Sequence, residues 1–271
     1  ANATLGRKHM EPATRAPVVL VYSKHYVKIL DRHHKHGERM QLWEALSSAY
    51  GLFSCPSRIR VIEPRMASFE ELEQFHTAEY LTYIKHNSIS AKEAEFDQKK
   101  RDELQELGLI DDCYLFEGLF EYMQWVAGST LTAAKVLVEG KAVVAINWGG
   151  GRHHAMPSMA SGFCYVNDIV LGILELLNAF DRVLYIDVDV HHGDGVEHAF
   201  KYSNEVFTLS FHRHGPGFFP GTGAIVDFGK GEGAYCNLNV PLDKGITDGQ
   251  YIRIFSRVLT AVTSRFQPKA V

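Results

Sequence analysis

The sequence has 271 residues, a formal net charge of −4 and a hydrophobic content of 46%. This length suits one large α/β domain or two small ones, and the apolar content is ample for a buried core. The acidic balance disfavours direct nucleic-acid binding, which needs a basic face, and no apolar run is long enough to cross a membrane.

The N-terminal segment and the cysteines indicate the compartment. Residues 1–16 lack the apolar stretch of a secretory signal, so we expect a disordered tail or an appended remnant there, and one folded domain over residues 17–271. The cysteines are scattered without a CxxC pair, at Cys55, Cys113, Cys164 and Cys236. This spacing is typical of reduced thiols in a nuclear or cytoplasmic protein and disfavours a disulfide framework or a zinc finger.

Strands and helices are expected to alternate from the start of this domain. Apolar, β-branched runs predict strands, and amphipathic periodicity predicts helices. The first elements expected are a strand over 16–22, a helix over 38–50, a strand over 59–62, a helix from Ser68 to Phe75 and a helix from Thr77. Ser68 and Glu71 form a capping-box pattern, which marks a helix start.

The alternation continues through the second half. Residues 91–106 are strongly charged and are interpreted as a solvated helix or loop insertion rather than a partner site. The later elements expected are a helix to Glu139, a strand over 142–147, a helix over 167–180, strands from 183 and over 206–211, a glycine-rich loop region to Pro241 and a helix over 246–266. This order predicts a three-layer α/β/α fold with a mainly parallel sheet.

The segment VLYIDVDVHHGDG, residues 183–195, predicts a metal site. It begins as a buried strand and ends in acids and histidines, where catalytic sites of α/β proteins lie. In an extended chain Asp187, Asp189 and His191 share one face, and the oxygen and imidazole of the last two suit a zinc ion. One Asp or His alone would be a cap or core residue, but the density of such groups here favours a metal.

A second strand end carries the run Gly149 to Gly151 and then His153 and His154. Glycines let the backbone approach a ligand closely, and two adjacent imidazoles suit proton transfer near neutral pH. Taken alone, this run would be interpreted as an exposed loop. Its position at the end of a strand favours a functional site.

Three other histidine or glycine patterns receive simpler interpretations. In SFHRHGPGFFPG, residues 210–221, we expect Phe218 to pack against the protein's own surface and the histidines to be loop residues. The run His33, His34 and His36 is expected to form a surface turn. GKGEG at 229–233 lacks the Lys-Ser/Thr and helix of a phosphate loop.

Together these segments resemble the histone deacetylase family, in its class I-like, zinc-dependent branch. The matching text is RMASFEELEQFHTAEYL, GGGRHHAMPSMASGFCYVNDIVLGI, VLYIDVDVHHGDGVEHAF and LSFHRHGPGFFPGTG. The resemblance covers about residues 18–271 and is dense in motifs. It implies the three-layer fold shared with arginases, and a histone or protein lysine deacetylase that acts in chromatin regulation and transcription repression.

The resemblance also implies roles for individual residues. The catalytic set would be His153 paired with Asp187 and His154 paired with Asp194. Zinc would be held by Asp189 and His191, and a structural potassium ion, largely through main-chain carbonyls, by Asp187, Asp189, His191, Ser210 and Phe211. Substrate would be bound by the tunnel walls Phe163 and Phe219 with Gly162, and by Asp112 at the rim, while Arg39 would lie near an inner channel for acetate.

Two pieces of the family pattern are absent from these residues. A catalytic zinc has three protein ligands, and the third implied here is an aspartate on a strand after the helix that ends near Phe266. The second piece is a tyrosine further on, which donates to the oxyanion. We therefore expect the catalytic domain over 17–271 to be C-terminally incomplete and to have little activity by itself. Tyr114 and Arg152 also depart from the family's commonest residues.

The implied chemistry agrees with physical expectation. Zinc lowers the pKa of its water and polarises the amide, and a histidine oriented by a carboxylate is a better base. We assign the general base and acid to His154 with Asp194, and interpret His153 as an electrostatic partner that stays protonated longer. Aromatic walls would favour an uncharged acyl-lysine over a free ammonium.

Other functions are left open. The same site could hydrolyse an acetylpolyamine, although Asp112 favours a peptide. A non-catalytic acetyl-lysine binder or corepressor scaffold is a second class, suggested by the missing ligand and tyrosine. An arginase-like binuclear manganese site is disfavoured by the tandem histidines. The substrates expected are acetylated histone tails or other acetyl-lysine proteins, in the nucleus, the cytoplasm or both, within a corepressor complex.

Overall fold

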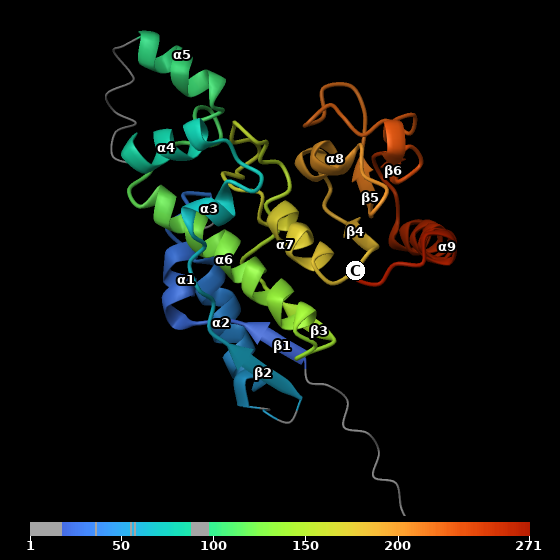
Figure 1. Ribbon diagram of the computed structural model, residues 1–271, viewed down its shortest axis with the longest axis horizontal. Coiled ribbons are helices and arrows are strands. Elements are labelled where there is room, and N and C mark those ends of the chain that lie inside the picture. Colours follow the sequence, from blue (N-terminus) through green and yellow to red (C-terminus); the bar gives the residue numbers. More distant parts are fainter. Residues whose placement is uncertain (1–17, 36, 55, 57, 88–97) are drawn as a thin grey trace, which may run out of the picture.

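The computed structural model describes residues 18–271 except 36, 55, 57 and 88–97 (Figure 1). The tail expected at 1–16 lies outside the described residues, as does part of the charged segment 91–106. Within the described part of the chain, no helix combines the length and apolar character needed to span a membrane.

The described strands form two parallel sheets of three strands each. In the first sheet β1 (Val18–Val21) lies between β2 (Ile59–Ile62) and β3 (Val144–Ile146). In the second sheet β5 (Val206–Arg213) lies between β4 (Val183–Asp187) and β6 (Asn237–Leu242). The expected α/β class with parallel pairing is confirmed, but these strands form two sheets where one was expected.

Helices follow most strands, as the alternating pattern predicts. They are α1 (Lys24–Leu30), α2 (Arg39–Ala49), α3 (Phe69–Leu72), α4 (Ala78–Asn87), α5 (Gln98–Glu106), α6 (Leu119–Val138), α7 (Asp168–Leu177), α8 (Asp194–Phe200) and α9 (Asp248–Phe266). The capping box is confirmed, because the Ser68 side chain accepts from the backbone N–H of Glu71 while the Glu71 side chain accepts from that of Ser68.

The second sheet shows the three-layer arrangement most clearly. Along β5, Val206 packs with α7 and α8 on one face, whereas Leu209 and Phe211 pack with α9 on the other. This alternation with a period of two residues is what a strand buried on both faces requires. Helix α6 packs against both β1 and α7, so it joins the two halves of the molecule (Figure 1).

One strand was missed from the sequence. The region up to Pro241 was predicted to be loop, yet β6 occupies Asn237–Leu242. Asn237 and Asn239 alternate with apolar residues and are buried against the carboxylate of Glu197. Because asparagine is uncommon in strands, a polar partner inside the fold concealed this strand in the sequence.

Candidate active site

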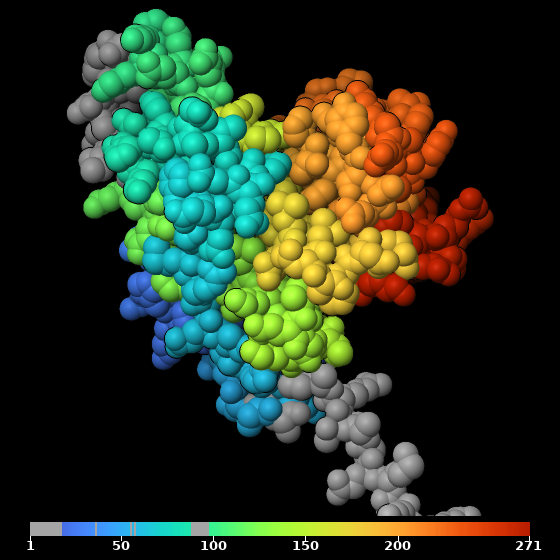
Figure 2. All heavy atoms as spheres, in the orientation of Figure 1, coloured from blue at the N-terminus to red at the C-terminus, as the bar shows by residue number. Residues whose placement is uncertain are grey.

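Most of the predicted site residues lie on or next to three loops that follow the carboxyl ends of β3, β4 and β5. The loops span residues 147–155, 188–193 and 214–223. Strand ends of this kind are where α/β proteins build their sites. Figure 2 shows the surface indented between the part that carries α4 and the part that carries α8.

The glycine-rich loop lies directly on a buried carboxylate. Asp168, the first residue of α7, is fully buried and accepts hydrogen bonds from the backbone N–H groups of Gly151 (3.0 Å) and Arg152 (2.8 Å). The Thr130 hydroxyl donates to the same carboxylate. A Cβ added at Gly150 would lie 2.4 Å from an oxygen of Asp168, so glycine is required for this approach.

The other side of this loop is held by the residue before Asp168. The Asn167 side chain donates to the carbonyl of Ala155 at 3.0 Å and accepts from the N–H of Val170, so it caps α7 as well. The N–H of Gly195 donates to the carbonyl of His153 at 3.0 Å. The backbone around the tandem histidines is therefore fixed by the start of α7 and the start of α8.

Each tandem histidine has its own carboxylate. His153 Nδ1 lies 2.6 Å from Asp187 Oδ2, and His154 Nδ1 lies 2.7 Å from Asp194 Oδ1. Both rings are buried, and their centroids are 3.9 Å apart. With Nδ1 donating to a carboxylate, each Nε2 is left to face a reactant. The structure thus brings together the four residues predicted to be catalytic.

The two histidines differ in how readily they hold a proton. Burial by itself would lower the pKa of His153, but the hydrogen bond and charge of Asp187 outweigh it and raise the pKa above 6.5. Burial lowers the pKa of His154, and the charge of His153 adds to this effect despite Asp194. His153 therefore keeps its proton to higher pH than His154.

Tyr185 was not anticipated at this site. Its hydroxyl donates to Asp187 Oδ2, the oxygen that also contacts His153. Burial would raise the pKa of Asp187, but His153 and Tyr185 outweigh it and lower that pKa. The sequence contains a signal for this contact. Tyr185 lies two residues before Asp187 on the same strand, so both side chains point to the same face.

The predicted metal ligands Asp189 and His191 lie next to the tandem pair. The prediction that they share one face of an extended strand was wrong. β4 ends at Asp187, and the chain then turns, with Asp187 accepting from the N–H of Asp189 and Asp189 accepting from the N–H of His191. An aspartate favours such turns because its side chain bonds to backbone two residues on. The two residues therefore meet through a turn and not through a shared strand face.

The donor atoms of this pair suit a tetrahedral metal. Asp189 Oδ1 lies 3.2 Å from His191 Nδ1 and 4.0 Å from His153 Nε2. Two zinc ligands at ~2.1 Å with a tetrahedral angle lie roughly 3.4 Å apart. Among the described residues, no group of three or more acid, histidine or cysteine side chains could hold a metal ion. The pair fits as two ligands of a zinc site that needs a third.

The residues predicted to hold potassium lie on two adjacent strands, β4 and β5, and in the turn that follows β4. Ser210 lies opposite Asp187 in the register of β4 and β5 and is buried, and Phe211 follows it. Their main chains thus lie next to the turn that carries Asp189 and His191. The potassium site itself stays a prediction.

Aromatic rings from the third loop cover the metal-ligand pair. The Phe219 ring lies 4.9 Å from His154 and 5.5 Å from His191, edge to face in both cases. Phe218 stacks on His191 at 5.2 Å and lies under the guanidinium of Arg213, in line with the expected packing of Phe218 on the protein itself. A Cβ on Gly162 would lie 2.5 Å from the ring of His154, so this glycine makes room beside the site.

The rim residues lie further out. Phe163 is 39% exposed and adopts a left-handed conformation with φ +67°. Asp112 is half-buried in the loop whose Tyr114 carbonyl accepts from the hydroxyl of Tyr165. Arg39 begins α2 and is exposed. The proposed roles of Asp112 at the rim and of Arg39 in a channel stay predictions.

One expectation near the rim was wrong. His33 was assigned to a surface turn with its neighbours, but its side chain is fully buried, whereas His34 is exposed. His36 lies outside the described residues.

A buried polar cluster behind the metal-ligand turn was also missed. His192 contacts Glu197 Oε2 at 2.9 Å and Thr222 Oγ1 at 2.8 Å, and Glu197 also accepts from Asn237 and Asn239. The cluster ties the turn to the loop that carries Phe219. Its members come from four segments that are separate in the sequence, so no local pattern predicts that they meet.

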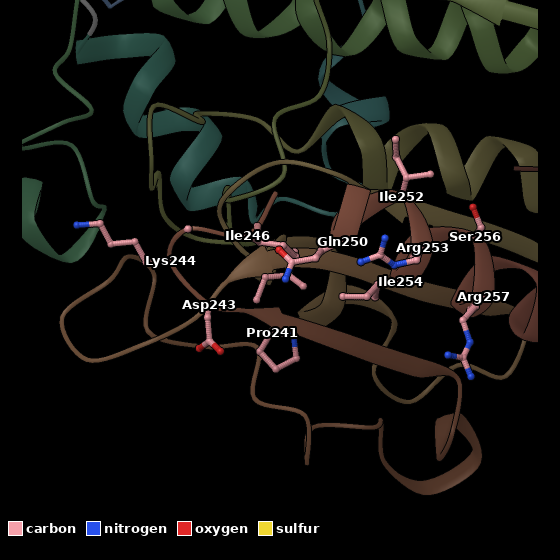
Figure 3. Close-up of a pocket in the computed structure, with 12 residues that line it drawn as sticks. Pro241, Asp243, Lys244, Ile246, Gln250, Ile252, Arg253, Ile254, Ser256 and Arg257 are labelled. Carbon is pink, nitrogen blue, oxygen red and sulfur yellow. The ribbon is translucent and has the colours of Figure 1, made fainter. Parts of the chain in front are cut away.

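One cavity lies away from this site. It has a volume of about 810 Å³ and is formed by the loop after β6 and by α9, with Lys244, Arg253 and Arg257 among its polar side chains (Figure 3). None of the predicted site residues lines it. A second cavity of about 310 Å³ lies between β3 and β4 and is mostly apolar.

Comparison with known proteins gives a consistent answer. The histone deacetylase domain family matches residues 33–271. The chain is 46% identical over 254 residues to Histone deacetylase 8 of Danio rerio, covering 94% of this chain and 65% of that protein. It is 50% identical over 212 residues to Histone deacetylase 8 of Xenopus laevis (78% and 63%), and 47% identical over 233 residues to Histone deacetylase 2 of Oryza sativa subsp. japonica (86% and 44%).

This chain belongs to the histone deacetylase family, which confirms the class I-like resemblance. It spans slightly less than two thirds of the length of the two Histone deacetylase 8 relatives and less than half of the Oryza sativa protein.

Proposed function

We propose that this protein is a zinc-dependent hydrolase that removes acetyl groups from lysine side chains of histones or other proteins. The observation that carries the proposal is the pairing of each tandem histidine with its own carboxylate, 2.6 and 2.7 Å away, beside the Asp189–His191 pair. The family relationship supports the same activity. The substrates we propose are acetylated histone tails or other acetyl-lysine proteins, in the nucleus or cytoplasm and within a corepressor complex.

Asp189 and His191 would hold the zinc ion, together with a third ligand from outside the described residues. Zinc bound there would polarise the amide carbonyl and lower the pKa of a water molecule. Structural potassium would be bound at the adjoining strand ends, near Ser210 and Phe211.

The tandem histidines would handle the protons. His154 has the lower pKa of the two, so its Nε2 is the better acceptor at neutral pH and suits the general base, which then returns the proton to the leaving amine. Asp194 fixes the orientation of that ring by accepting from Nδ1. His153 keeps its proton longer because of Asp187, so it provides a positive charge beside the developing oxyanion.

The substrate would approach between aromatic residues. Phe219 lies against His154, Gly162 leaves space beside the same ring, and Phe163 is exposed at the rim. An apolar passage of this kind favours the methylenes of an uncharged acyl-lysine, because a free ammonium would be desolvated there at a high cost.

The experiment measures zinc content and turnover of a fluorogenic acetyl-lysine peptide by this chain and by a version extended past Val271, with an acetylpolyamine as the second substrate. We expect stoichiometric zinc and chelator-sensitive turnover of the peptide in the extended form. His154→Ala should retain zinc and lose turnover, whereas the exposed His34→Ala should retain both. Zinc binding without turnover of either substrate would contradict the enzyme and favour a binding module. Preference for the polyamine would correct the substrate class.

A further inference from the structure

The turn between α1 and α2 contains a histidine that neither the metal pair nor the tandem pair uses. His33 is fully buried, and its Nδ1 lies 3.2 Å from the backbone N–H of Lys35. A backbone N–H can only donate, so Nδ1 must be an acceptor and the ring proton must be on Nε2. His33 Nε2 lies 3.1 Å from the carbonyl oxygen of Phe163 and therefore donates to it.

The recipient of this bond has an unusual backbone. Gly162 has φ +53° and Phe163 has φ +67°, so two consecutive residues are left-handed. Glycine adopts this conformation freely, but a residue with a bulky side chain does so only when its surroundings hold it there. The conformation directs the Phe163 ring outward, where 39% of the residue is exposed.

The imidazole itself is held by rings from three other segments. The ring centroids of Phe116, Tyr122 and Tyr165 lie 5.6 to 6.1 Å from the centroid of the His33 ring. Burial, with the charge of Arg152, lowers the pKa of His33 to about 4, so the ring is neutral at physiological pH. The same turn reaches Phe163 a second time, because Lys35 Nζ lies 5.5 Å above the Phe163 ring.

We propose that His33 is a positioning residue that holds Phe163 in its left-handed conformation and so sets the entrance for the acyl-lysine side chain. The inference rests on the proposed function, because it takes Phe163 as a wall of the substrate passage. His33 acts on substrate binding and not on the chemical step, since it contacts none of the four residues of the two histidine–carboxylate pairs.

The test compares three variants of the intact, zinc-loaded protein. His33→Leu keeps an apolar side chain of similar bulk but cannot donate, whereas His33→Gln places an amide N–H near the position of Nε2. His34→Leu is the matched control for ring stacking, because the exposed His34 ring stacks on His33 with centroids 4.9 Å apart but does not bond to Phe163. We expect His33→Leu to raise KM for an acetyl-lysine peptide about 10-fold with kcat within about twofold. His33→Gln should recover most of this loss, and His34→Leu should resemble the wild type.

Two kinetic results would overturn the inference. One is a loss in kcat with KM unchanged in His33→Leu. The other is a His33→Gln variant as impaired as His33→Leu, which would show that ring packing matters and the donated bond does not.

A second measurement needs no turnover. The ¹⁵N NMR shifts of the His33 ring report its tautomer, and we expect the neutral form with the proton on Nε2 at pH 7. A proton on Nδ1 would overturn the inference whatever the activity. An inactive wild-type protein with the proton on Nε2 would instead overturn the proposed function, and the role of Phe163 with it, while leaving the hydrogen bond in place.

Discussion

Two of the chain's three adjacent histidine pairs, His33–His34 and His153–His154, fold into opposite environments. In the first pair one ring is fully buried among aromatic rings and donates to a carbonyl, and the other is exposed. In the second pair both rings are buried and each donates to a carboxylate. At His33 burial outweighs the bond to the carbonyl and lowers the pKa, whereas at His153 the carboxylate of Asp187 outweighs burial and raises the pKa. The group that accepts the ring N–H, a backbone carbonyl or a carboxylate, therefore distinguishes the structural histidine from the catalytic ones.

The largest effect should come from removing a histidine of the carboxylate-backed pair. For His154→Ala we expect kcat to fall by roughly 10²- to 10⁴-fold, because a positioned general base contributes that much. His34→Ala, the matched change in the other pair, should leave kcat within about twofold. Peptide turnover is the measurement, with circular dichroism to confirm folding. Equal losses in both variants would remove the distinction between the pairs.

The carboxylate beneath the glycine-rich loop should matter for stability as well as activity. Asp168→Ala would leave two backbone N–H groups and the Thr130 hydroxyl without their buried acceptor. The cost of each orphaned group predicts a loss of roughly 3 kcal/mol or more in the free energy of unfolding. Urea titration would measure it. Since the tandem histidines follow directly, kcat should fall even where the protein remains folded, and an unchanged kcat would show that the loop is held by other contacts.

The pH dependence of stability should differ in sign between buried histidines that are neutral and His153, which is backed by a carboxylate. Burial lowers the pKa of His33 and of His76 to about 4, below the 6.5 of an unfolded chain. Between these values the unfolded chain binds more protons, so stability falls as the pH falls from 6.5 towards 4, by roughly 3 kcal/mol for each histidine. The pKa of His153 is raised, so its contribution is present below pH 6.5 and is lost as the pH rises through its folded value.

The check is the free energy of unfolding at pH 7 and at pH 4.5 for the wild type and His33→Leu. The variant should lose about half of the acid sensitivity that these two buried neutral histidines produce. An equal acid sensitivity in both proteins would mean that His33 is not buried and neutral in solution.

Local patterns predicted the class of fold and indicated a site where glycine, aspartate and histidine follow strand ends. The family resemblance, and not the local pattern, implied the pairing of His153 with Asp187 and of His154 with Asp194 that the structure brings together. The sequence could not predict the burial of His33, because the rings that cover that side chain come from residues more than 80 positions later. For the same reason β6 was missed, since the partner of its asparagines, Glu197, lies on α8.

The smallest expected effect tests how the glycine-rich loop is held. Thr130 donates to Asp168 and accepts from the side chain of Asn147 at 2.8 Å, so it joins α6 to the loop without touching either tandem histidine. Thr130→Val keeps the shape and removes one hydroxyl, and we expect a loss of about 1 kcal/mol in the free energy of unfolding with kcat almost unchanged. Urea titration and peptide turnover give the two values. A large loss of kcat would mean that the position of Asp168, and through it the backbone before His153, depends on α6, so the carboxylate would not anchor the loop by itself.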